Sequence, residues 1–203
     1  MFKSLAKDLS GSADICKAVT DFRKLEAANF LLPGEQVMFA FQSPKEEWIF
    51  TNEAIIALYG DSATTTRRLV ERFEYRTYYI TNVKFETTGR VDRDCEIKFK
   101  ANEFDVSIDI ARKEENAVKK HYKALLALSR EQEHRRRRME MSNKGLKTSA
   151  DALLLQNLSL NSEASAESSP LTALASSVLA SIQNDYETIN PRCYRDVLAA
   201  ALR

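Results

Sequence analysis

A chain of 203 residues is long enough for one domain with an appendage, and its 44% hydrophobic content allows a buried core. The formal charge of +1, from 30 basic and 29 acidic residues, excludes a global field that would favour nucleic acid or an anionic surface. Three widely spaced cysteines, no apolar run of about 20 residues and no apolar N-terminal stretch favour a cytoplasmic protein.

The first 30 residues are predicted to form an amphipathic helix. Their apolar side chains recur three or four positions apart, as they would on one face of a helix. These positions are Ile15, Val19, Phe22 and Leu25. Pro33 and Gly34 then end the helix.

From Glu35 the period of the apolar residues changes from about 3.6 to 2, which is typical of β-strands. Seven short alternating runs follow at hairpin spacing. They cover residues 37–41, 48–50, 55–59, 69–75, 83–87, 95–99 and 104–110. Asn102 lies between the last two runs, where a hairpin needs its turn. The pattern predicts a meandering antiparallel sheet and not parallel strands joined by helices.

The helical period returns after Ala111 and continues to about Leu128. The apolar face of this second helix is formed by Val118, Tyr122, Leu125 and Leu126. Seven strands followed by one amphipathic helix indicate a bent barrel whose open end the helix plugs, at ~1.5–3 kcal/mol for each large apolar side chain buried. We therefore predict an α+β, mainly β fold over residues 31–130, with Trp48 and Phe99 in its interior.

Residues 131–203 are predicted to form a basic segment, a linker and a helical tail. A chain truncated near Gly145 is expected to keep a folded barrel. Gly145 is expected to break the first tail helix, and residues 161–169 have the composition of a linker. Beyond Pro170, an apolar stripe without charge is a candidate partner helix. Its residues are Leu171, Leu174, Val178, Leu179 and Ile182. The stripe either packs back on the barrel or docks into another chain.

Three blocks of the sequence carry a family signature. Residues 31–37 read Leu-Leu-Pro-Gly-Glu-Gln-Val, residues 48–52 read Trp-Ile-Phe-Thr-Asn, and residues 85–98 read Phe-Glu-Thr-Thr-Gly-Arg-Val-Asp-Arg-Asp-Cys-Glu-Ile-Lys. In these blocks the chain resembles the bacterial pleckstrin-homology (PH) domain family, over roughly residues 1–128. It departs from that family at Glu53-Ala54, where a basic pair is usual, and at Tyr78-Tyr79, where Pro-Tyr is usual. The resemblance implies a PH-like fold, no catalytic residues and a tendency to assemble into rings, and it brings no ligand with it.

No arrangement of residues in the sequence points to catalysis or to a bound metal. Only two histidines are present, His121 and His134, and the chain has no Gly-rich phosphate loop, HExxH motif or CxxC pair. Asp92 and Asp94 alternate with arginines at a turn, where salt bridges and turn hydrogen bonds account for them. We predict no catalytic residue, no metal and no cofactor, and therefore no enzyme.

Two basic regions are candidates for binding an anion or an acidic partner. In the fourth predicted strand, arginines occupy the outward face, and the region comprises Arg67, Arg68, Arg72 and Arg76. These arginines either pair with Glu74 and cross-strand carboxylates or form a stripe for a phosphate or an acidic partner. The second region comprises Arg135, Arg136, Arg137 and Arg138. It either ends a helix, where cations favour the dipole, or contacts acidic lipid, nucleic acid or an import receptor.

Acidic neighbours weaken both basic signals. Glu131, Glu133 and Glu140 flank the second region, so we do not expect nucleic acid as the main partner. The loop over residues 42–47, where many PH domains bind a lipid headgroup, holds Lys45 next to Glu46 and Glu47. Carboxylates beside a lysine make a poor phosphate site.

The sequence therefore predicts a non-catalytic PH-like scaffold or adaptor that acts through protein–protein contacts and self-association, as a homo-oligomer. The alternative is a peripheral membrane module that binds anionic lipid through the two basic regions. The identity of the protein partner stays open at this point.

Overall fold

The computed structural model describes residues 15–60, 68–87 and 94–159, and then residues 177, 180, 181, 184–186 and 188–203. The chain divides into two compact units. The barrel unit is Met1–Gln132 together with Arg192–Arg203, and the second unit is Glu133–Pro191.

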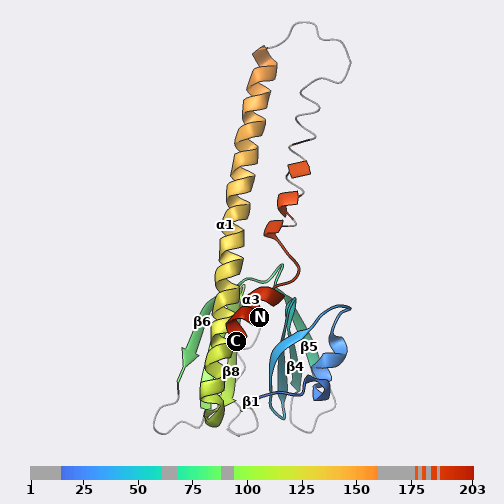
Figure 1. Ribbon diagram of the computed structural model, residues 1–203, viewed down its shortest axis with the longest axis vertical. Coiled ribbons are helices and arrows are strands. Elements are labelled where there is room, and N and C mark those ends of the chain that lie inside the picture. Colours follow the sequence, from blue (N-terminus) through green and yellow to red (C-terminus); the bar gives the residue numbers. More distant parts are fainter. Residues whose placement is uncertain are drawn as a thin grey trace. The chain divides into compact units, whose positions relative to one another are not determined.

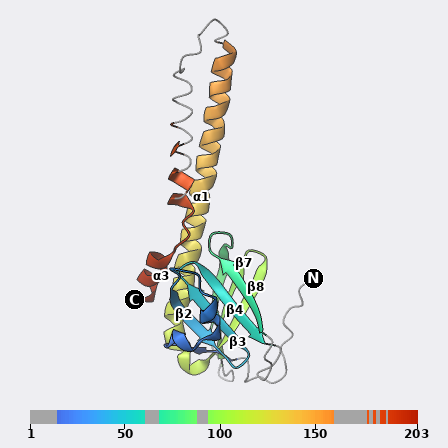
Figure 2. The ribbon, with the colours of Figure 1, turned by 90° about the vertical axis from the view of Figure 1, so that its right-hand side faces the viewer.

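The barrel unit contains two antiparallel sheets (Figure 1). The five-stranded sheet has the order β1 (Lys17–Ala18), β2 (Val37–Gln42), β3 (Glu46–Thr51), β4 (Ala54–Gly60) and β5 (Arg68–Glu74). The three-stranded sheet has the order β6 (Ile80–Glu86), β7 (Asp94–Ala101) and β8 (Phe104–Ala111). Paired strands are always neighbours in sequence, and Figure 1 shows β4 and β5 on one side with β6 and β8 on the other. Figure 2 turns the unit so that the side of β4 and β5 faces the viewer. The seven predicted strands are confirmed as β2 to β8.

The predicted N-terminal helix is wrong over residues 15–30, because this segment pairs with both sheets, and residues 1–14 lie outside the described residues. The amide of Cys16 donates to the carbonyl oxygen of Asp109 at 2.8 Å, and the amide of Val19 donates to that of Ala40 at 3.0 Å. Only two short 3-10 turns follow, η1 (Phe22–Lys24) and η2 (Glu26–Phe30). The segment closes one side of the barrel between β2 and β8.

The middle strands of the five-stranded sheet, β3 and β4, are buried on both faces. The inner face of the sheet joins the main core, where Trp48 and Phe99 are buried as predicted. Its outer face is covered by the segment around η2, whose Leu25 and Ala27 form a second cluster with residues of β2, β3 and β4. The strand residues of that cluster are Ala40, Ile49, Ile56 and Leu58. Burial on both faces explains the nearly continuous apolar sequences of β3 and β4.

A single long helix, α1 (Glu115–Ser159), follows η3 (Arg112–Glu114). Its first turns plug the barrel, with Val118, Leu125 and Leu128 fully buried in the main core. The helix does not end near Leu128, and Gly145 does not break it. A glycine in a helix interior costs only about 1 kcal/mol relative to alanine, which the good helix formers around it offset.

The last helix, α3 (Arg195–Leu202), belongs to the barrel unit. Tyr194 and Leu198 are buried in the main core, and Val197, Ala201 and Leu202 pack against it. The prediction that all of residues 131–203 lie outside the barrel is therefore wrong for Arg192–Arg203. Periodicity shows that a helix has an apolar face, but it does not show which surface covers that face.

Candidate functional site

The outward arginines of β5 are held in contacts within the chain. Arg72 forms ion pairs with Glu35 at 3.0 Å and with Glu74 at 3.3 Å. Arg68 donates to the carbonyl oxygen of Lys45 at 3.0 Å and lies 3.8 Å from a carboxylate oxygen of Glu26. Arg67 lies outside the described residues. For Arg68 and Arg72 the contacts favour the first interpretation, in which the arginines support the fold.

Glu35 is a buried carboxylate that the sequence analysis missed. It accepts hydrogen bonds from the hydroxyl of Thr51 at 2.5 Å, from the amide of Leu32 at 2.9 Å and from Arg72 at 3.0 Å. Burial opposes ionisation of Glu35, but these three donors outweigh it and hold the pKa of the carboxyl below its ordinary value. The only signal in the sequence was the Gly-Glu pair that follows Pro33.

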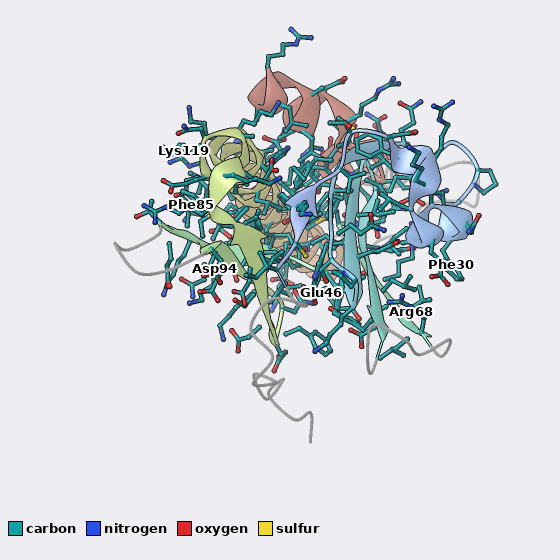
Figure 3. All side chains as sticks on the ribbon, turned by 90° about the horizontal axis from the view of Figure 1, so that it is seen from below. Phe30, Glu46, Arg68, Phe85, Asp94 and Lys119 are labelled. Carbon is teal, nitrogen blue, oxygen red and sulfur yellow. The ribbon has the colours of Figure 1, made fainter. Side chains whose placement is uncertain are left out.

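Glu35 also fixes the exposed turn that precedes it. Its amide donates to the carbonyl oxygen of Leu32 at 3.0 Å, and Gly34 adopts a φ of 85°, a conformation that favours glycine. Two exposed apolar side chains lie here: Leu32 in the turn, at 39% exposure, and Phe30 at the end of η2, at 46%. We call Phe30 and Leu32 the apolar turn. Figure 3 shows Phe30 and Arg68 on the same side of the unit, opposite Phe85 and Lys119.

The hairpin between β2 and β3 uses its glutamates for structure. Glu47 is buried and accepts hydrogen bonds from the amide of Ala27 at 2.8 Å and from the side chain of Gln42 at 2.7 Å. The amide of Ser43 closes the turn on the carbonyl oxygen of Glu46 at 2.8 Å. The loop is therefore a tight hairpin, and its Glu47 holds η2 on the sheet.

The end of the chain is fastened to the turn between β3 and β4. The amide of Tyr194 donates to the carbonyl oxygen of Asn52 at 2.7 Å, and the Asn52 side chain donates to the Sγ of Cys193 at 3.2 Å. Arg192 forms an ion pair with Glu53, a position where the sequence departs from the PH pattern. We call Arg192–Leu202 the C-terminal clasp.

Arg76 lies next to the clasp and not in an extended arginine stripe. Together with Glu53, Glu74 and Arg192 it lines a hollow of about 350 Å³. Two acidic and two basic side chains make this hollow close to neutral, so it does not offer the field that a phosphate needs.

Gln132 joins α1 to the segment between β5 and β6. Its side-chain nitrogen donates to the carbonyl oxygens of Tyr75 at 2.8 Å and Tyr78 at 3.0 Å, and its oxygen accepts from the amide of Ile80 at 2.8 Å. The sequence analysis missed this residue. A polar side chain four positions after Leu128, on the buried face of the helix, was the available signal.

The second basic region lies inside α1, so the alternative in which it ends a helix is wrong. Arg136 and Arg137 both bind Glu133, and Arg136 also binds Glu140. Hydrogen bonds from the two arginines lower the pKa of Glu133 to about 2. Arg135 donates to the carbonyl oxygen of Thr188 at 3.0 Å, within the second unit. Arg138 is exposed.

The remaining predicted features fall partly outside the described residues. The apolar stripe Leu171, Leu174, Val178, Leu179 and Ile182 lies there entirely. Among the residues that the structure describes, no three or more His, Cys, Asp or Glu side chains are grouped as metal ligands. Within the same ranges, no helix is both long and apolar enough to cross a membrane.

The model of the family described as "Bacterial PH domain" matches residues 9–129. The chain belongs to this family. The uncharacterized protein YvbH of Bacillus subtilis (strain 168) is 36% identical over 133 residues, which are 64% of this chain and 65% of YvbH, just under two thirds of its length. A PH-domain-containing bacterial protein from Exiguobacterium sibiricum 255-15 has a crystal structure with a TM-score of 0.80 at 30% identity, covering 94% of this chain and 100% of that one. The predicted family and the PH-like fold are confirmed.

In this bacterial PH domain, the Thr51-Asn52 pair of the family signature builds the turn that receives the clasp. The hydroxyl of Thr51 accepts a hydrogen bond from the amide of Ala54 at 2.8 Å, and the Asn52 side-chain oxygen accepts one from the amide of Gln36 at 2.6 Å. The pair therefore has a structural role that the sequence comparison alone did not assign.

Proposed function

We propose that this protein is a non-catalytic scaffold or adaptor that acts through protein–protein contacts, including contacts between copies of itself. The observation that carries the proposal is the apolar turn. Phe30 and Leu32 are exposed, and the turn that begins at Leu32 is held by two hydrogen bonds between Leu32 and the buried Glu35. Apolar side chains presented on a rigid surface are typical of protein contact sites, because their contact costs little ordering entropy.

The basic residues of the barrel also favour protein contact over lipid binding, because their side chains already contact groups within the chain. Arg68 and Arg72 are already bound within the chain, and Lys45 lies beside Glu46 on a tight hairpin. A lipid headgroup at these positions would have to compete with existing hydrogen bonds. Apolar contact through the turn needs no such exchange.

The test compares the mass of the protein in solution before and after the apolar turn is made polar. We expect Phe30→Ser/Leu32→Ser to lower the mass measured by light scattering at a fixed protein concentration. Leu69→Ser is the matched control, because Leu69 is 59% exposed but lies on β5. A wild-type chain that is monomeric at every concentration, or a double variant with unchanged mass, contradicts the proposal.

A second candidate function is peripheral binding to anionic lipid through the basic region of α1. The observation that favours it is the exposure of Arg137, whose side chain is 70% exposed, beside exposed Arg138. Sedimentation with anionic liposomes tests this candidate, because electrostatic binding weakens steeply between low and physiological salt. Arg137→Glu/Arg138→Glu should abolish the binding, whereas Lys45→Glu should leave it unchanged.

A further inference from the structure

The C-terminal clasp is bound by the barrel as a ligand would be, through a polar rim and a buried interior. At the rim, the carbonyl oxygen of Asn52 accepts a hydrogen bond from the amide of Tyr194, and the side chain of Asn52 donates one to the Sγ of Cys193. Glu53 forms an ion pair with Arg192. In the interior, the ring of Tyr194 packs edge to face on the ring of Tyr75. A few polar contacts around buried anchors are also what distinguishes specific interfaces between proteins.

The rim of the receptor is held by residues outside the clasp. The turn at Asn52 is held by the hydrogen bond from the amide of Gln36 and by the hydrogen bond from the amide of Ala54 to the hydroxyl of Thr51. All of these partners belong to the barrel strands or to the turns next to them. A rim that is held in advance lowers the ordering cost of docking a segment.

We propose that this receptor also takes the clasp of a second copy, so that two copies exchange their C-terminal segments through the same contacts. The partner is therefore the chain itself, and the docking segment is Arg192–Leu202. The inference rests on the proposed self-association and supplies one route for it. Exchange of an identical element creates an interface without any new contact, because each receptor binds the segment for which it is already shaped.

The connection between the clasp and its own receptor is long. It runs through residues 133–191, which form the second unit. Docking of a clasp in its own receptor closes a loop through this unit, and the entropy cost of closure grows with loop length. Copies gathered in an assembly bring the clasps of neighbouring copies close to each receptor, where they compete with its own clasp.

A disulfide trap at the rim distinguishes the two modes of docking in the full chain. The Sγ of Cys193 lies 3.2 Å from the side-chain nitrogen of Asn52, so Asn52→Cys brings a second thiol next to it. Oxidation with oxidised glutathione then links a clasp to the receptor that holds it. A clasp in its own receptor yields a linked monomer, and an exchanged clasp yields a covalent dimer on a non-reducing gel. Asn52→Cys/Cys193→Ser is the control and should form neither product.

We expect the dimer fraction to rise at least about fivefold as the protein concentration rises from about 1 μM to about 100 μM, because exchange joins two copies. Only linked monomer at every concentration, from a wild-type chain that self-associates by light scattering, overturns the exchange and leaves the proposed function intact. No linked product at all also overturns it. A wild-type chain that is always monomeric contradicts the proposed self-association instead.

A peptide experiment decides the matter if Asn52→Cys disturbs the fold. Leu198→Asp in the full chain removes the buried anchor of its own clasp. This variant should bind a labelled peptide of residues 190–203 at least about tenfold more tightly than the wild-type chain does, because its receptor is empty. The same peptide carrying Leu198→Asp should bind at least about tenfold more weakly. A folded variant that binds neither peptide, or both equally, overturns the proposal.

Discussion

Tyr194 packs edge to face on Tyr75, with ring centroids 5.9 Å apart, and the carbonyl oxygen of Tyr75 accepts a hydrogen bond from Gln132. One residue at the end of β5 therefore contacts both the plugging helix and the C-terminal clasp. The barrel core is complete only when the last residues of the chain have returned to it.

Leu198→Ala should destabilise the fold by about 2–5 kcal/mol, because Leu198 is fully buried and its removal leaves a cavity. Urea unfolding followed by far-UV circular dichroism measures the change. Asp196→Ala, on the exposed side of α3, should change the stability by less than about 0.5 kcal/mol. Equal effects of the two substitutions would show that the clasp does not belong to the cooperative core.

Gln132→Met should cost about 2–4 kcal/mol, since it keeps a similar shape but leaves one buried amide and two carbonyl oxygens without their partner. The exposed neighbour Arg130 offers the control Arg130→Met. Hydrogen exchange at the amide of Ile80 gives a local readout. Protection of that amide should fall in the Gln132 variant and persist in the control.

Arg72→Met should cost about 2–3 kcal/mol at pH 7, because it leaves the carboxylate of Glu35 buried with one donor fewer. The pKa of Glu35 is depressed in the fold, so its contribution is present above the unfolded value of 4.5 and is lost as the pH falls below it. The difference between the variant and the wild type should therefore shrink at low pH. Arg23→Met, which breaks an exposed pair with Asp21, should have little effect at either pH.

His121 should make the fold less stable in mild acid. Burial, with a smaller contribution from Lys120, lowers the pKa of His121 from 6.5 to about 4. Between these values the unfolded chain binds a proton that the folded chain does not, so stability falls as the pH falls, by a total on the order of 3 kcal/mol. His121→Phe should flatten the dependence between pH 6.5 and pH 4, and His134→Phe, at an exposed position, should not. A parallel pH dependence in wild type and His121→Phe would contradict the assignment.

The strands were predictable because their signal is local. In β7, for example, Cys95, Ile97 and Phe99 point inward at every second position, as the pleat of a strand requires. The N-terminal segment was wrongly predicted to be a helix for a related reason. Val19, Phe22 and Leu25 have helical spacing because they pack on one face of the five-stranded sheet, and short 3-10 turns produce that spacing as well as a helix does.

The sequence by itself determined the seven strands, the plugging helix and the membership of the PH family, since each depends on the period of neighbouring residues or on short signatures. Only the tertiary structure decided that Glu35 meets Arg72, that Gln132 meets Ile80 and that Asn52 meets Tyr194. In each case the partners are far apart in the chain. Their meeting depends on which surfaces close on each other when the barrel folds, and no local pattern of polarity carries that information.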